Sequence, residues 1–297
     1  MTVELAAKPR AVSPRLENWR RAWHRFRTTP LATSGMVVIV LLLLAALFGP
    51  LVAPYARDIY GGTDTAIRFQ PPSAAHWFGT NDLGQDVLSL ALGGARITLL
   101  ASFAVVLLGA IVGTLLGAIA GYFGGIADEV IMRFTDLMLI LPGLILAMVI
   151  GAALGAGLGN LIIAIAASWW PGYARLVRGE VLAKREELFI VATRALGARD
   201  RRIIFNHILP NIGQVLIVRM SIDIGGAILT IASLGFIGIG IKPPIPEWGL
   251  QLSQARLNMP DIWWPALAPG IAIFLAVFAF NIVGDALRSA LDPRATR

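Results

Sequence analysis

The side chains that could do chemistry in this sequence are few, and several of them interrupt long apolar runs. Arg219 and Asp223 stand four residues apart in one run, Arg133 and Asp136 stand three apart in another, and Asn281 interrupts a third. If these runs cross a membrane, such residues are costly there and must pair or line a polar path. We therefore predict local pairing of Arg219 with Asp223 and of Arg133 with Asp136, facing the interior of the bundle. The functional alternative is that Arg219, Asp223 and Asn281 line a candidate translocation path, and a proton relay would use similar residues.

Sequence patterns for catalysis are missing from the chain. It has no G-x-x-x-x-G-K-[ST] phosphate loop, no H-E-x-x-H and no G-x-S-x-G. The three histidines, His24, His76 and His207, lie far apart, and the absence of cysteine rules out disulfides, thiolate zinc sites and a cysteine nucleophile. We expect no catalytic residue, metal site or cofactor in this chain. It is predicted not to be an enzyme, so a partner must supply any energy that is used.

The composition is typical of helical membrane proteins. Hydrophobic residues make up 57% of the chain and charged residues only 14%, outside the usual range of soluble domains. The apolar runs approach the roughly 20 residues that a helix needs to cross the hydrocarbon, and none alternates like a transmembrane strand. The sequence predicts an all-α polytopic membrane protein with six transmembrane helices, at about 33–53, 96–121, 131–155, 158–176, 212–236 and 264–286.

The placement of Lys and Arg predicts the orientation of these helices. A basic tail precedes the first run, which favours a retained signal anchor over a cleaved signal peptide. With the N-terminus inside, 20 of the 25 Lys and Arg residues fall on the inner side, as the positive-inside rule requires. The outer side holds Arg57, Arg68, Arg96, Lys242 and Arg256. Both termini are predicted to be cytosolic, and the net charge of +7 reflects topology rather than binding of nucleic acid.

This topology divides the chain into three parts. We expect a basic cytosolic N-terminal tail at 1–30, a first transmembrane helix with an outer loop at 31–95, and a core of five helices at 96–297. Within the second predicted span, glycines recur every four residues and share one helical face. Small residues allow close backbone contact between membrane helices, so we predict tight packing there, with a pore-lining stripe as the alternative. These glycines are Gly109, Gly113, Gly117 and Gly121.

A polar, basic segment, 186–211, separates two of the apolar runs. It is longer than a turn requires and has helical periodicity, which predicts two short helices joined at Gly197. Leu209-Pro210-Asn211 is expected to end the second helix before the next span begins. Apolar and cationic faces on these helices would suit insertion into a groove of a cytosolic partner. A solvated or membrane-surface pair of basic helices is the alternative.

The same segment resembles the EAA loop of permease subunits from binding-protein-dependent ABC importers. That pattern is E-A-A, three residues, Gly, nine residues, then Ile-x-Leu-Pro. Ala192, Gly197, Leu209 and Pro210 match it, whereas Val191, Thr193 and His207 depart from it. Four longer segments resemble the dipeptide/oligopeptide/nickel permease subfamily, and specifically its second, C-type subunit. They are 71–99, 195–211, 233–249 and 280–294.

The resemblance covers about residues 20–294 and implies a type I ABC importer permease fold in a bacterial cytoplasmic membrane. The implied partners are the lipid bilayer, a homologous second permease subunit, two cytosolic ATPase subunits that carry ATP and Mg, and an extracytoplasmic substrate-binding protein. It implies a cytosolic coupling loop at 186–210, where the arginines would contact an acidic ATPase surface or only solvent. The coupling residues are Ala192, Gly197, Arg199, Arg201, Arg202, Leu209 and Pro210.

An outer segment and the substrate complete these expectations. We expect the third outer loop to contact the binding protein or dip toward the substrate, through Pro243, Pro244, Glu247 and Trp248. The resemblance favours di- or oligopeptides as substrates, with nickel chelates or other small solutes as the alternative. A secondary transporter and a channel or structural scaffold are the other classes. Association with ATPase subunits and ATP-dependent uptake would separate them from an ABC importer.

Overall fold

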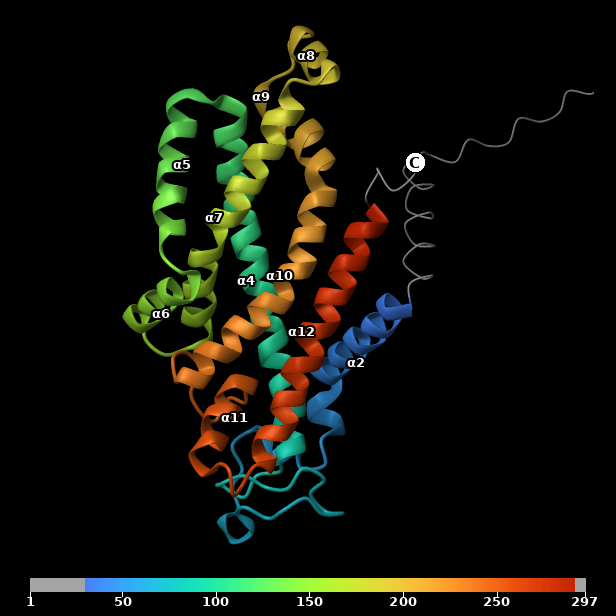
Figure 1. Ribbon diagram of the computed structural model, residues 1–297, viewed down its shortest axis with the longest axis vertical. Helices are drawn as coiled ribbons and strands as arrows, with labels where there is room; N and C mark the ends of the chain where they lie inside the picture. The colour runs from blue at the N-terminus through green and yellow to red at the C-terminus, as the bar shows by residue number, and fades with distance from the viewer. Residues whose placement is uncertain (1–29, 292–297) are drawn as a thin grey trace, which may run out of the picture.

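The structure, a computed structural model, describes residues 30–291, which form an elongated bundle of helices (Figure 1). Among these residues there is one isolated β-bridge, between Thr80 and Asp86, and no named strand. The all-helical fold predicted from the sequence is confirmed to that extent. The predictions for the basic tail at 1–30 and for the last residues of the chain lie outside the described residues, except for Pro30.

Seven long helices build the bundle, and seven short helical segments connect them. The long ones are α2 (Pro30–Val52), α4 (Val87–Phe123), α5 (Gly125–Ile140), α6 (Gly143–Leu154), α7 (Leu158–Arg185), α10 (Leu209–Ile237) and α12 (Trp264–Leu291) in the part of the chain described. The short ones there are α3 (Ala56–Ile59), η1 (Thr65–Ile67), α8 (Leu188–Ala195), α9 (Asp200–Ile203), η2 (Ile204–Ile208), α11 (Trp248–Ala255) and η3 (Arg256–Asn258).

Four helices within residues 30–291 are long and apolar enough to cross a membrane. They are α2, α4, the continuous run of α9, η2 and α10, and α12. The bent pair α5–α6 adds a fifth span if it is counted as one. The predicted fourth span, 158–176, lies inside α7, which is long but carries charged residues toward its end. Helix length and apolar character thus account for four or five of the six predicted spans.

Two predicted spans differ from the helices that form. The helix expected at 96–121 begins earlier, at Val87, because the Asp86 carboxylate caps it and accepts a hydrogen bond of 2.8 Å from the backbone N–H of Ser89. The span expected at 131–155 is broken after Ile140, and its two halves meet at 92°. Pro142 has no N–H to continue the helix, and Leu141 before it takes an extended conformation.

The glycine face of α4 packs against α7, as predicted. The two helices make the most extensive helix–helix contact among the described residues. A Cβ atom added at Gly113 would overlap the carbonyl oxygen of Trp170, and one added at Gly121 would lie 2.9 Å from the carbonyl oxygen of Arg178. Such distances leave no room for a side chain, so the glycines allow the two backbones to touch. The pore-lining alternative for this stripe is therefore wrong.

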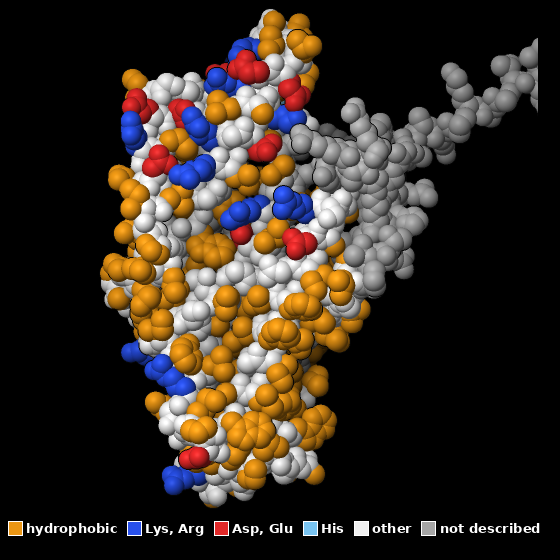
Figure 2. All heavy atoms as spheres, viewed as in Figure 1, with side chains coloured by type: hydrophobic (Ala, Val, Ile, Leu, Met, Phe, Trp, Pro, Cys, Tyr) orange, Lys and Arg blue, Asp and Glu red, His pale blue; other side chains and the backbone are white. Residues whose placement is uncertain are grey.

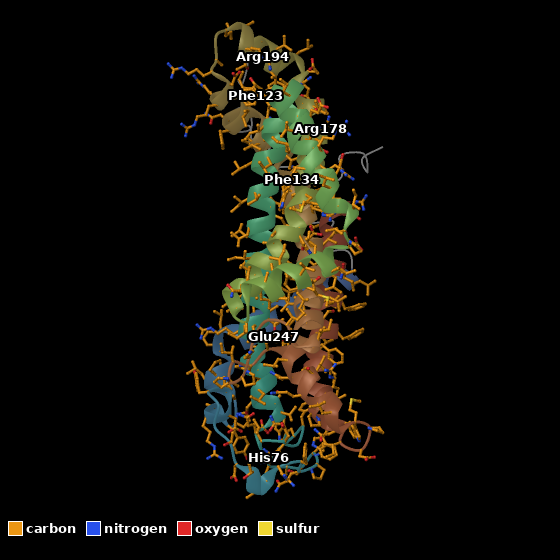
Figure 3. All side chains as sticks on the ribbon, turned by 90° about the vertical axis from the view of Figure 1, so that its left-hand side faces the viewer. His76, Phe123, Phe134, Arg178, Arg194 and Glu247 are labelled. Atoms are coloured by element: carbon orange, nitrogen blue, oxygen red, sulfur yellow. The ribbon has the colours of Figure 1, made fainter. Side chains whose placement is uncertain are left out.

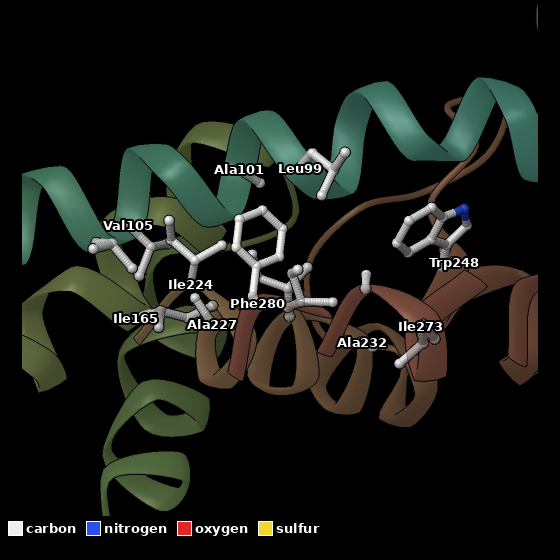
Figure 4. Packing of buried hydrophobic residues seen from close by; sticks show 14 of the residues in the cluster. Leu99, Ala101, Val105, Ile165, Ile224, Ala227, Ala232, Trp248, Ile273 and Phe280 are labelled. Carbon is white, nitrogen blue, oxygen red and sulfur yellow. The ribbon is translucent and has the colours of Figure 1, made fainter. Parts of the chain in front are cut away.

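The main hydrophobic core lies where α4, α7, α10 and α12 meet. Figure 4 shows Leu99 and Val105 of α4 facing Ile224 of α10 and Phe280 of α12, all of them buried. A second cluster lies toward α8 and α9. Because α10 and α12 contribute apolar residues on the side that faces α4, the three helices form one continuous packed unit.

The two ends of the molecule differ in character. We call the end that carries α8 and α9 the α8–α9 end, and the opposite end, with α11 and residues 54–86, the α11 end (Figure 1). On the face seen in Figure 2, charged side chains gather toward the α8–α9 end, while hydrophobic side chains cover much of the middle. Figure 3 places Arg194 near the α8–α9 end and His76 at the α11 end. A middle rich in exposed apolar side chains suits a bilayer.

Candidate functional site

The predicted coupling loop forms two short helices, one on each side of Gly197. Helix α8 ends at Ala195, and Gly197 follows with φ of +80°. The N–H of Gly197 donates to the Arg194 carbonyl over 2.9 Å, and the N–H of Ala198 donates to the Thr193 carbonyl over 3.3 Å. This pair of bonds is a Schellman cap, which places glycine in the left-handed region. The structure therefore supplies a local reason for glycine at this position.

The second helix of the loop does not end at Leu209-Pro210-Asn211, so that prediction is wrong. The helix runs without a break from Asp200 to Ile237. A π-helical segment, Ile204–Ile208, precedes the proline, and the N–H of Leu209 donates to the carbonyl of Ile204. A π turn widens the helix where proline would otherwise clash with the carbonyl four residues back. Proline is accommodated here in the first turn of α10 rather than ending a helix.

A buried apolar cluster fixes the loop to three long helices. Ile190 of α8 and Ile203 of α9 are fully buried. They pack in one cluster with Ala118 of α4, Val181 of α7 and Ile212 of α10. The α8–α9 loop is thus seated on the bundle by hydrophobic burial, so a force applied to it reaches α4, α7 and α10 together.

Tyr122, near the end of α4, adds a polar connection to both loop helices. Its hydroxyl donates a hydrogen bond of 2.6 Å to the Asp200 carboxylate at the start of α9. The Arg194 guanidinium of α8 lies 5.4 Å from the centre of the Tyr122 ring, a cation–π distance. Sequence reasoning missed this residue because nothing in the spacing of Tyr122, Arg194 and Asp200 indicates that they meet.

The open side of the loop carries apolar and cationic side chains. Leu188 is 87% and Leu196 88% exposed, although the loop contains a fully buried isoleucine. Ala192 is exposed as well, and Leu209 half-buried. Exposed leucines on a structured loop are typical of a surface that a partner covers. Beside them an open concavity is lined by Arg199, Arg201, Arg202, Phe205 and Asn206.

Charge pairs join α5 to α7 along the half of the molecule toward the α8–α9 end. Arg178 makes two bonds to the Asp128 carboxylate, of 2.5 and 2.6 Å, and Figure 3 labels Arg178 in the half of the molecule toward the α8–α9 end. Arg175 contacts Asp136 over 2.6 Å. The predicted pair of Arg133 with Asp136 is therefore wrong, and Arg133 lies 3.9 Å from Glu129 instead. Antiparallel packing of α5 and α7 brings Asp136 a partner that is far away in the sequence.

The residues predicted to line a translocation path meet only in part. Arg219 Nε donates to Asp223 Oδ2 over 2.8 Å, so this local pair is confirmed. The amide of Asn281, on α12, donates to the carbonyl of Val277 in its own helix over 2.8 Å. A Cβ atom added at Gly225 would lie 2.9 Å from the Asn281 amide nitrogen, so α10 and α12 approach closely one half-turn beyond Asp223.

The outer segment is divided between exposed and buried residues. Pro243 and Pro244 are exposed. Glu247 is 0% and Trp248 1% exposed, so these two side chains are not available for contact with a binding protein. The Trp248 ring nitrogen donates to the carbonyl of Ala91 over 2.9 Å. Trp248 therefore fastens α11 to α4, and the predicted outer contact stays a prediction for the two prolines.

Glu247 caps the start of α11 from inside the protein. Its carboxylate accepts hydrogen bonds of 2.8 Å from the N–H groups of Gly249 and Leu250. Burial raises the pKa of this carboxyl above its usual range, and the hydrogen bonds from Gly249, Leu250 and Thr98 oppose part of that rise. The group lies near the middle of the long axis, toward the α11 end (Figure 3). It is a buried titratable group whose partners come from α4 and α11.

Two protein families together match most of this chain. Residues 113–297 match the family described as binding-protein-dependent transport system inner membrane component. Residues 17–72 match the N-terminal transmembrane domain of oligopeptide transport permease C. The glutathione transport system permease protein GsiD of Escherichia coli O157:H7 is 43% identical over 276 residues, or 93% of this chain and 90% of that relative. The protein of the same name from Shigella boydii serotype 4 gives the same values.

Proposed function

This chain belongs to the family of binding-protein-dependent transport system inner membrane components, and from that premise we propose how it works. It is an ABC transporter permease, a multi-pass protein of the inner membrane and a transport subunit rather than an enzyme. We propose that it forms one half of the membrane part of an ATP-driven importer. Its partners are a homologous second permease, two cytosolic ATPases that hold ATP and Mg²⁺, and an extracytoplasmic substrate-binding protein.

The α8–α9 loop is the observation that carries this proposal. It combines exposed leucines and arginines on its open side with fully buried isoleucines underneath. A loop that only connects two helices needs neither feature. Closure of the ATPase dimer on ATP would push on this surface, and the buried cluster would pass the movement to α4, α7 and α10. Such a movement would switch the permease pair between inward- and outward-facing states by rocking of packed helices.

We propose six spans: α2, α4, the bent pair α5–α6, α7, α10 and α12. In support, α4 and α7 both end at the α8–α9 end, and α5 starts there (Figure 1). An even count places both termini on the side of residues 186–210. The excess of Lys and Arg makes that side cytosolic, which leaves α11 and residues 54–86 on the outer face.

The proposed substrates are di- and oligopeptides. Part of the chain matches the N-terminal domain of oligopeptide transport permease C, and the similar permeases from Escherichia coli and Shigella are named for transport of glutathione, itself a peptide. A nickel chelate is the alternative substrate for this proposal. The described residues contain no group of three or more His, Cys, Asp or Glu side chains that could hold a metal ion.

Reconstitution tests the function directly. The chain would be purified with its second permease and two ATPases, placed in proteoliposomes and supplied with the binding protein. We expect uptake of a labelled tripeptide that requires both ATP and the binding protein. A matched preparation with an inactive ATPase should show none. Uptake that continues without ATPases would refute the proposal in favour of a secondary transporter, and uptake of nickel chelate alone would select the alternative substrate.

The topology has an equally direct test, because the natural sequence contains no cysteine. Single cysteines would be introduced as Leu196→Cys on the α8–α9 loop and as Pro243→Cys on the outer segment, both at exposed positions. A membrane-impermeant maleimide added to intact cells should label the cysteine at 243 and should label the one at 196 only after the membrane is opened. The reverse pattern would overturn the orientation.

A further inference from the structure

The charged pair on α10 leaves most of one guanidinium free. Only Nε of Arg219 is bound to Asp223, over 2.8 Å. The Asp223 side chain is 11% exposed, whereas that of Arg219 is 54% exposed. Within residues 30–291, neither Nη atom of Arg219 has a hydrogen-bond partner. Asp223 therefore fixes one edge of the guanidinium and leaves the two-pronged edge open.

Lipid is a poor neighbour for that open edge. Arg219 lies within a helix that is long and apolar enough to cross a membrane. An arginine side chain that faces hydrocarbon is costly and therefore rare. A half-exposed guanidinium inside such a helix must therefore face water or another protein group. The exposed edge of Arg219 therefore needs a polar partner that is not among the described residues.

The neighbouring helices supply a rigid frame for this pair. Tyr173 of α7 is 2% exposed and interacts electrostatically with Asp223. Its hydroxyl therefore lies next to the carboxylate. Asn281 of α12 packs against Gly225 of α10. Asp223 is thus held next to Tyr173 of α7, and it in turn positions Arg219.

We propose that Arg219 binds a carboxylate of the passing substrate through its two Nη groups while Asp223 holds Nε. This inference rests on the proposed function and adds a chemical class to it: peptides that carry a free carboxylate. The planar fork of arginine matches a carboxylate in two parallel hydrogen bonds. Asp223 offsets much of the positive charge, so the site binds weakly enough for a substrate to leave again, as passage requires.

A protection experiment on the wild-type assembled transporter tests the site. Phenylglyoxal, which modifies arginine, would be applied to the complex in nanodiscs, and modification of Arg219 would be measured by mass spectrometry. Trialanine should slow the modification about 10-fold, the scale of a charge-assisted hydrogen bond, and trialanine amide should not. Arg175 is the internal control, since it is 57% exposed and also paired with an aspartate. Its modification should not respond to either peptide.

The opposing outcomes are distinct. Equal protection of Arg219 by acid and amide, or by neither, would overturn the proposal and indicate that Arg219 contacts the partner permease. As a second measurement, uptake of trialanine should fall about 10-fold in Arg219→Gln and less in Arg219→Lys. If those variants do not assemble, the wild-type protection result decides. Failure of the proposed function looks different, because ATP-dependent uptake by the wild type would then be absent altogether.

Discussion

The contact between α4 and α7 predicts that the same substitution at two glycines of one stripe has different effects on stability. A Cβ added at Gly109 would lie 3.5 Å from its nearest neighbour, Trp169, which is ordinary contact. One added at Gly113 would overlap the Trp170 carbonyl oxygen and the Tyr173 Cβ, and would lie 2.9 Å from the Ala174 nitrogen. The neighbours at Gly113 are backbone and Cβ atoms, which cannot turn away.

The magnitude follows from the pair of variants. Replacing glycine with alanine in a helix favours the helix by about 1 kcal/mol, and this gain is common to Gly109→Ala and Gly113→Ala. Overpacking costs about 1–3 kcal/mol and applies only at Gly113. The stability of Gly113→Ala should therefore lie about 1–3 kcal/mol below that of Gly109→Ala. For a protein of this size each kcal/mol lowers Tm by roughly 2–4 °C.

The assay is thermal unfolding of the purified permease complex in one detergent, followed by intrinsic fluorescence, with expression level as a second measure. Gly109→Ala should unfold at or above the wild-type temperature, and Gly113→Ala should unfold roughly 2–12 °C below Gly109→Ala. A separate variant, Gly113→Val, should unfold at a lower temperature than Gly113→Ala, because a β-branched side chain adds more atoms to the same overlap. The reasoning is refuted if Gly113→Ala is as stable as Gly109→Ala.

Three further predictions concern the loop and the outer segment. Gly197→Val should uncouple ATP hydrolysis from uptake while the complex still assembles, because valine is strained at φ of +80°. Arg201→Glu should have the same effect. Substrate-stimulated ATPase activity and uptake at wild-type levels in both variants would count against a coupling role for the loop. Tyr122→Phe removes the bond to Asp200 at a cost of about 1 kcal/mol, so we expect weaker coupling with little change in Tm; unchanged uptake per ATP would contradict this. The raised pKa of Glu247 means that burial penalises its charged form. The stability that this carboxyl contributes is therefore greatest below its unfolded pKa and falls as pH rises through its folded pKa. Glu247→Gln should flatten that part of the Tm–pH profile, and an identical profile in both proteins would argue against this role of Glu247.

Hydropathy predicted the long helices well because each apolar run is a local property of the sequence. The bend after Ile140 had a signal that was overlooked, since Leu141-Pro142-Gly143 is a strong break in any helix. The early start of α4 was harder to predict. It depends on Asp86, whose backbone N–H donates to the Asp58 carboxylate over 2.8 Å from the outer loop, and such a contact exists only once the chain has folded.

Charge pairing shows the same limit. Arg219 and Asp223 sit one helical turn apart, so the sequence alone could pair them. Asp136 had a near neighbour in Arg133, yet it pairs with a residue of α7. Glu247 and Trp248 were expected to contact the binding protein or to lie toward the substrate, and both are buried. Which of several possible partners a side chain takes is decided by helix packing, which a pattern in one segment does not contain.

The unbroken helix from Asp200 to Ile237 has a mechanical consequence. Its 38 residues measure about 57 Å along the helical path. One end belongs to the loop on which we propose that the ATPases act, and at the other Gly235 lies against the Glu247 carboxylate of the outer segment. A rotation of about 5° about either end moves the opposite end by about 5 Å. The backbone is thus a lever arm that carries displacement across the bilayer without a relay of side-chain rearrangements in between.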